Sequence, residues 1–147
     1  MKVEIRLQKG CPEPHIILVA DHMTRELDLL VKRLQQNQAS AITGFHGSQA
    51  VLLEPERIMR LYAGQGKVFA GAMDGNEYVV KARLYELEAR LASEGFVRIS
   101  NSELVNLRQI KGFDLSLAGT IRVTLSNGQT TYVSRRYVGK IKERLGI

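Results

Sequence analysis

Residues 95–106, the decisive stretch of this sequence, read Gly95-Phe96-Val97-Arg98-Ile99-Ser100-Asn101-Ser102-Glu103-Leu104-Val105-Asn106. Its residues 96–99 are strand-like, and the apolar run from Leu104 to Ile110 predicts a second strand. Just upstream, leucines recur at helical spacing over residues 84–91, and Gly95 can end that helix because glycine adopts left-handed backbone angles. The stretch therefore predicts a short helix followed by two strands.

Towards the C-terminus, the pattern predicts a hairpin and a last helix. Residues 121–125 alternate apolar and polar side chains, and Asn127-Gly128 separates them from a second strand over residues 130–133. Ser134 can cap a final helix, whose apolar stripe consists of Val138, Ile141 and Leu145.

Upstream of the decisive stretch, further strands are expected from about Ile42 onward. Candidates cover residues 50–53 and 58–62, and a hairpin with an Asp74-Gly75 turn joins residues 67–73 to 77–81. These patterns, with the helices, predict an α+β fold that is mostly β.

The first 42 residues are expected to form a separate β-β-α lobe, with a second domain over residues 43–147. Residues 2–7 and 16–19 predict strands, and Thr24 can cap a helix to about Gln36. The helix stripe consists of Leu27, Leu30, Val31 and Leu34. Because this lobe is too small to hold a core alone, it is either an interaction or dimerisation element or packs on the β domain of its own chain.

Charge is distributed unevenly along the chain. The net charge is +6, yet residues 1–80 hold nine basic and nine acidic side chains, whereas residues 81–147 hold twelve basic and six acidic ones. Such an asymmetry indicates either a polyanionic partner for the C-terminal part or a solvated basic face without one.

Patterns typical of catalysis and of metal binding are absent from the sequence. Cys11 is the only cysteine, and none of His15, His22 and His46 has a metal-ligand spacing to another ligand. Residues 64–67, Gly-Gln-Gly-Lys, fit neither the dinucleotide fingerprint nor the P-loop. The sequence therefore predicts a protein that is not an enzyme and has no cofactor, no metal and no small-molecule substrate.

The N-terminus and the hydropathy pattern predict a cytoplasmic protein. Charged and apolar residues alternate over residues 1–6, which is unlike a signal peptide, and there is no apolar run of about 18 residues that could span a membrane.

Two arginines stand where a helix normally carries acidic residues. Arg135 and Arg136 directly follow the cap candidate Ser134, although the helix dipole disfavours cations in the first turn. Either the two arginines lower the stability of the helix by a small amount that the protein tolerates, or they mark a site where free N–H groups and guanidinium groups bind an anion.

The decisive stretch resembles the core motif of LytTR DNA-binding domains, the output domains of many bacterial two-component regulators. Residues 132–142, Tyr-Val-Ser-Arg-Arg-Tyr-Val-Gly-Lys-Ile-Lys, resemble the C-terminal signature of that family, and the resemblance runs from about residue 45 to 147. It implies an elongated stack of small antiparallel sheets with short helices, not a helix-turn-helix, and a bacterial transcription regulator that reads successive major grooves of double-stranded DNA through loops.

The resemblance also implies the residues that contact DNA. Two base-reading positions of the family fall on Asn101 and Arg136, and the third falls in the loop before residue 67, where Lys67 is the first candidate and Gln65 the next. The residues that flank these positions suit phosphate contacts: Ser100, Ser102, Ser134, Arg135 and Lys140.

Family members usually carry a receiver domain of more than 100 residues before the DNA-binding domain. About 40 residues precede it here, so the chain resembles the stand-alone subgroup, often controlled by a membrane-bound inhibitor protein, and Asp21 is not expected to be phosphorylated. A homodimer on two half-sites is expected, because three reading loops discriminate too little alone. The alternative function is a protein-interaction or anionic-surface module with a basic C-terminus.

Overall fold

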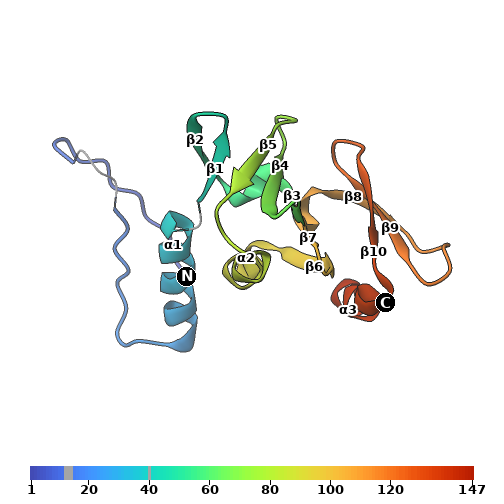
Figure 1. Ribbon diagram of the computed structural model, residues 1–147. Helices are drawn as coiled ribbons and strands as arrows, with labels where there is room; N and C mark the ends of the chain where they lie inside the picture. The colour runs from blue at the N-terminus through green and yellow to red at the C-terminus, as the bar shows by residue number, and fades with distance from the viewer. Residues whose placement is uncertain (12–14, 40) are drawn as a thin grey trace. The chain divides into compact units, whose positions relative to one another are not determined.

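The computed structural model describes residues 1–11, 15–39 and 41–147. The chain separates into two compact units, Met1–Leu34 and Gln35–Ile147 (Figure 1). Each unit is described by itself below.

In the first unit, the expected helix forms and the expected strands do not. Helix α1 (Arg25–Ala39) begins after Thr24, whose hydroxyl accepts a hydrogen bond from Leu27 N at 3.2 Å. The prediction of strands over residues 2–7 and 16–19 is wrong, because neither segment belongs to a sheet. Alternating side chains suit one face of a sheet, but a strand also needs a partner for its backbone N–H and C=O groups.

The second unit is built from ten strands in two antiparallel sheets with two further α-helices (Figure 1). The larger sheet has the order β2-β1-β5-β4-β3-β7-β6, and the smaller one has the order β10-β9-β8. In chain order the elements are β1 (Ile42–His46), β2 (Gln49–Leu53), η1 (Pro55–Arg57), β3 (Ile58–Gly64), β4 (Lys67–Ala72), β5 (Glu77–Val80), α2 (Leu84–Leu91), η2 (Ala92–Glu94), β6 (Phe96–Ser100), β7 (Glu103–Asn106), η3 (Leu107–Gln109), β8 (Ile110–Asp114), β9 (Ile121–Leu125), β10 (Thr130–Val133) and α3 (Arg135–Leu145). The predicted mostly-β fold of small antiparallel sheets with short helices is confirmed.

Strands β3, β6 and β7 are covered on both faces, so each carries apolar side chains at neighbouring positions. One face contributes to a core with α2 that contains Ile58 and Leu104. The opposite face contributes to a second core, shared with β9, β10 and α3, that contains the neighbouring residues Met59 and Val105. Adjacent residues of one strand thus enter different cores, and the three strands form the common wall between them.

The apolar run from Leu104 to Ile110, which predicts one strand, is in fact broken. β7 ends at Asn106, and the short 3-10 helix η3 precedes β8. Asn106 is buried, its Nδ2 donates to Ile58 O at 2.9 Å and Pro55 O at 3.3 Å, and its Oδ1 accepts from Arg108 N at 3.0 Å. A buried amide whose hydrogen bonds join η1 to η3 ends the strand, and apolar content alone does not reveal this.

Two turns fix the strand ends that matter below. Gln65 and Gly66 both have positive φ, 54° and 74°, and they form a tight turn in which Gly64 pairs with Lys67. Gly95, with φ +88°, ends the short helical segment before β6 as the sequence predicts.

Candidate nucleic-acid interface

Three polar segments for which the family resemblance implies DNA contact lie together at one end of β3, β6 and β7. Ala63 N, near the end of β3, donates to Ser102 O at 2.8 Å, so the following turn at Gln65-Gly66 lies beside the β6–β7 turn. Ser134 N donates to Ile99 O at 2.8 Å, which brings the start of α3 to the same turn. The antiparallel pairing of the strands therefore gathers segments about 70 residues apart in sequence.

The β6–β7 turn has its own internal hydrogen bonds. Ser100 Oγ accepts from Ser102 N at 3.2 Å, and the two serine hydroxyls lie 3.4 Å apart. The pairing register shifts between Arg98 and Ser100, so β6 carries an extra residue just before the turn, and Asn101 is exposed at the tip of the turn. Both serines shape this tip, in addition to the phosphate role expected for them.

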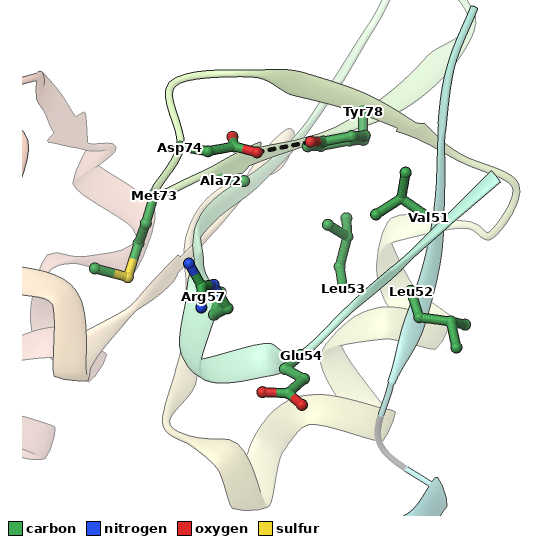
Figure 2. Close-up of a pocket in the computed structure, with 9 residues that line it drawn as sticks. All are labelled: Val51, Leu52, Leu53, Glu54, Arg57, Ala72, Met73, Asp74 and Tyr78. Atoms are coloured by element: carbon green, nitrogen blue, oxygen red, sulfur yellow. Dashed lines mark hydrogen bonds between the residues drawn. The ribbon is translucent and has the colours of Figure 1, made fainter. Parts of the chain in front are cut away.

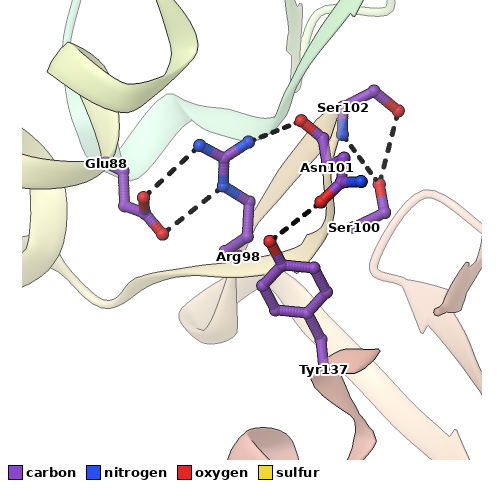
Figure 3. A network of polar contacts seen from close by, with 6 residues as sticks. All are labelled: Glu88, Arg98, Ser100, Asn101, Ser102 and Tyr137. Carbon is purple, nitrogen blue, oxygen red and sulfur yellow. Dashed lines mark hydrogen bonds and ion pairs between the residues drawn. The ribbon is translucent and has the colours of Figure 1, made fainter. Parts of the chain in front are cut away.

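Arg98 holds the turn from behind (Figure 3). Its Nη1 donates to Asn101 O at 2.7 Å, and its Nε and Nη2 both lie 3.4 Å from the Glu88 carboxylate on α2. The Arg98 side chain is only 14% exposed, so its charge is neutralised inside the protein. Arg98 is thus a positioning residue rather than a cation presented to a ligand.

Tyr137, in the first turn of α3, holds the side chain of Asn101 (Figure 3). Its hydroxyl donates to Asn101 Oδ1 at 3.1 Å. One lone pair of Oδ1 is therefore occupied, while the second lone pair and the two Nδ2 protons have no partner among the described residues. Asn101 is oriented by a neighbouring element and keeps one acceptor and two donor positions open to solvent.

The start of α3 has uncapped N–H groups and two exposed arginines. Ser134 has extended backbone angles at the N-cap position, as the sequence predicts, but its side chain makes no capping hydrogen bond. The Arg135 guanidinium lies against Gly119, where an added Cβ would be 3.0 Å from Arg135 Nε. Arg136 is exposed in the same turn. The helix N-terminus and these side chains together provide a positive surface.

Four arginines of this unit are paired with carboxylates, whereas the exposed basic side chains of the three polar segments are not. Arg60, Arg98, Arg108 and Arg122 each form an ion pair, with Glu103, Glu88, Glu94 and Asp114 respectively. Within the described part of the chain, none of Lys67, Arg135, Arg136 and Lys140 has an ion-pair partner. Lys140 instead lies 5.8 Å from the centre of the Tyr137 ring. The exposed basic side chains of these segments are therefore available to an external anion.

One surface hollow lies elsewhere, between β2 and the β4–β5 turn (Figure 2). It measures about 280 Å³, and its apolar wall is formed by Val51, Leu52 and Leu53. Asp74 Oδ2 accepts from Tyr78 OH at 2.7 Å and its Oδ1 accepts from Asn76 N at 2.8 Å. The Tyr78 hydrogen bond lowers the pKa of Asp74, whose carboxylate stabilises the turn and offers no catalytic group.

A second hollow, of about 340 Å³, contains the face of the larger sheet around Arg60. Arg60 Nη2 lies 3.9 Å from Glu103 Oε1, while Arg60 Nε and Glu103 Oε2 are buried without hydrogen-bond partners in the described structure. Burial raises the pKa of Glu103, and the nearby guanidinium offsets this only in part. The Arg60 guanidinium also stacks 4.2 Å from the Tyr62 ring centre. These contacts lie within the larger sheet, between β3 and β7, and form no convergent catalytic group.

Over residues 1–11, 15–39 and 41–147, no group of three or more His, Cys, Asp or Glu side chains could hold a metal ion. In the same residues, no helix is both long and apolar enough to cross a membrane.

Sequence reasoning assigned no role to three residues that shape the interface. Arg98 and Tyr137 lie inside the quoted motifs, and Glu88 lies on the preceding helix, but their contacts join elements 10 and 36 residues apart. Of these three residues, only Arg98 could have been identified from the sequence, since an arginine inside an otherwise apolar strand needs a buried partner. Lys67 and Gln65, in contrast, lie at the tip of the β3–β4 turn where the sequence suggests them, and both are exposed.

Comparison with known proteins gives consistent results for the second unit. A family model described as the LytTr DNA-binding domain matches residues 48–146. The structure is similar to a LytTr DNA-binding domain from Bacillus cereus, with a TM-score of 0.70 and 25% sequence identity, over 74% of this chain and 98% of that one.

Curated relatives match over the full length. An uncharacterized HTH-type transcriptional regulator of Staphylococcus aureus strain NCTC 8325 / PS 47 is 29% identical over 148 positions, which cover 100% of this chain and 99% of the relative. A protein with the same description from strain MRSA252 is 28% identical over the same coverage.

The described fold contains no helix-turn-helix, because that motif needs two helices joined by a turn of three or four residues. Here α1, α2 and α3 are each separated from the next by several strands. The chain belongs to the LytTr DNA-binding domain family.

Proposed function

We propose that the chain is a sequence-specific DNA-binding transcription regulator that reads the major groove through loops. The observation that carries this is the junction of three exposed polar segments with unpaired basic side chains, in a member of a DNA-binding family. Because no recognition helix of the helix-turn-helix kind exists in the described residues, the turns at the strand ends are the best candidates for base contact.

Asn101 and Arg136 are the proposed base-reading residues with the strongest chemical support. The free Nδ2 protons and the remaining Oδ1 lone pair of Asn101 match the N7 acceptor and N6 donor of adenine. The guanidinium of Arg136 can donate two parallel hydrogen bonds to O6 and N7 of guanine. Lys67, at the tip of the β3–β4 turn, is the proposed third reading residue, and Gln65 is its alternative.

Arg135, Lys140 and the serines of the two turns are proposed to contact phosphates. The Arg135 guanidinium packs against Gly119, so Arg135 is proposed to contact a phosphate and not a base edge. The first-turn N–H groups of α3 lack a side-chain cap, so a phosphate can accept their hydrogen bonds together with the Ser134 hydroxyl. Such contacts orient the protein on the duplex but carry no sequence information.

Two protomers are proposed to bind two similar half-sites. Each good base contact discriminates by about 1–3 kcal/mol, so three contacts per protomer give limited specificity against a genome. A second protomer doubles the number of base contacts.

Binding-site selection from random duplex DNA, at near-physiological salt, tests the proposal. The expected result is an enriched motif with two similar half-sites in tandem, and loss of one preferred base pair per half-site for Arg136→Ala. Arg144→Ala, at the far end of α3, is the control that removes an exposed charge outside the interface. Recovery of no enriched sequence would favour the anionic-surface or protein-interaction function instead, because binding by charge alone does not discriminate bases.

A further inference from the structure

A row of large apolar side chains stands exposed at the N-terminus. Val3, Ile5 and Leu7 are 84%, 82% and 96% exposed. Between them, Glu4 Oε1 and Arg6 Nε form an ion pair at 3.6 Å, so these two charged side chains lie on a common side. The segment thus alternates apolar and charged side chains like a strand, although it belongs to no sheet of this chain.

The rest of the first unit does not cover this row. The α1 stripe of Leu27, Leu30, Val31 and Leu34 is partly buried, while Ile16, Ile17 and Val19 are 69%, 73% and 93% exposed. Monomeric soluble proteins rarely expose so many large apolar side chains in neighbouring segments. A strand with unpaired backbone groups is also a template for pairing with another chain. Both features indicate that something outside the first unit covers residues 3–7.

We propose that residues 2–8 pair antiparallel with the same residues of a second copy, about a two-fold axis at Ile5. In this register Val3 lies opposite Leu7 of the partner, Ile5 lies opposite its own copy, and Glu4 lies opposite Arg6. The pairing gives the inward-pointing N–H and C=O groups of each strand a partner and forms one continuous apolar row on one face.

The charge pattern identifies the occupant as a second copy. In the Ile5-centred register, two Glu4–Arg6 pairs form across the strands, which is favourable for directly opposed residues. A register centred on Glu4 would instead oppose Glu4 to itself and Lys2 to Arg6. A shift by one residue would mix apolar and charged side chains on one face. A register centred on Val3 would also oppose Lys2 to Glu4, but it would pair only residues 1–5 and leave Leu7 outside the ladder. The register centred on Ile5 is therefore the longest one that satisfies both faces.

Other kinds of partner fit this segment less well. The first 34 residues hold six basic and five acidic side chains, so they present no charge for a polyanion. The self-complementary order of Glu4, Ile5 and Arg6 is the property expected of a two-fold interface, in which one patch contacts itself. The proposal rests on the homodimer of the proposed function but not on base reading, so the two can fail separately.

Disulfide cross-linking of the full chain tests the register. In a Cys11→Ser background, Ile5→Cys places two thiols on directly opposed residues, whose Cα atoms are about 4.5–5.5 Å apart in such a pair, within the range that a disulfide spans. Val3→Cys is the matched control, because its two copies would be displaced by four residues, about 13 Å. Rapid oxidation of Ile5→Cys alone to a covalent dimer is the expected result. No dimer, or equal oxidation of both variants, would overturn the proposal.

Charge reversal provides a second measurement that leaves the apolar row intact. Glu4→Arg and Arg6→Glu should each raise the dimer dissociation constant about tenfold, and the double variant should restore it. Sedimentation of the full chain gives these constants, and binding of each variant to a single half-site checks that the second unit remains folded. A monomeric wild-type chain, or a double variant as weak as the singles, would overturn the proposal even if DNA reading proves correct.

Discussion

Tyr137→Phe tests whether the side chain of Asn101 is oriented before DNA binds. The substitution removes only the hydroxyl that donates to Asn101 Oδ1 at 3.1 Å. The ring remains against the second core and below Lys140. If the hydrogen bond orients Asn101, its loss should affect recognition of one base pair more than it affects folding.

The expected magnitude follows from the type of hydrogen bond. A protein hydrogen bond contributes a net of about 0.5–1.5 kcal/mol, and this one is exposed, so about 0.5–1 kcal/mol is appropriate. Affinity for the selected site should therefore fall about two- to fivefold. Asn101→Ala, which removes the reading group itself, should cost about 1–3 kcal/mol. Affinity for random DNA should hardly change for either variant, because no phosphate contact is removed.

A double-mutant cycle on the selected duplex makes the test specific. In an Asn101→Ala background, Tyr137→Phe should have no further effect on affinity, because the hydroxyl then has nothing to orient. Tyr85→Phe is the matched control, since Tyr85 is 61% exposed on α2 and its hydroxyl has no hydrogen bond within the described chain. Additive losses in the cycle, or an equal loss on random DNA, would refute the positioning role of Tyr137.

Three further predictions concern the interface and the core. Arg136→Lys should cost about 1–3 kcal/mol on the selected duplex and flatten discrimination at one base pair, whereas Lys140→Ala should weaken binding to selected and scrambled duplexes alike and lower the salt slope by about one unit. Salt titrations measure both, and equal losses on the two duplexes for Arg136→Lys would remove its base-reading role. Asn106→Ala should lower the free energy of unfolding by about 2–4 kcal/mol, because it leaves buried backbone groups unpaired. A urea titration that shows a loss below about 1 kcal/mol would contradict this prediction. Glu103→Gln should raise the free energy of unfolding near neutral pH but not in acid. Burial raises the pKa of Glu103 in the folded state. The stability linked to protonation of Glu103 is therefore complete below its ordinary pKa of 4.5 and is lost as pH rises through its pKa in the folded protein. Urea titrations on either side of that range check the sign, and an equal gain at both pH values would contradict it.

Local patterns in the sequence predict much of the second unit. The Asp74-Gly75 and Asn127-Gly128 turns lie in hairpins as expected, because such dipeptides fit the backbone of a tight turn whatever surrounds them. The helix repeat over residues 84–91 and the end near Gly95 are also confirmed. These features depend on residues close together in sequence.

Features that depend on distant partners were not predictable in the same way. β7 ends at Asn106 because its amide binds backbone groups about 50 residues away, and no local pattern encodes this. The N-terminal alternation was interpreted as a strand, but these residues pair with no strand among the described residues. The contacts that orient Asn101 likewise come from two other elements, so its position in the motif was visible from the sequence and its orientation was not.

Replacing single guanines by 7-deazaguanine in the selected duplex tests the central claim most directly. The replacement removes only the N7 acceptor, which lies in the major groove. If Arg136 reads a guanine there, wild-type affinity should fall by about 1–3 kcal/mol at one position of each half-site, and the Arg136→Ala variant should not respond to the replacement. Undiminished wild-type affinity at every guanine, or an equal loss with Arg136→Ala, would contradict major-groove reading by the start of α3.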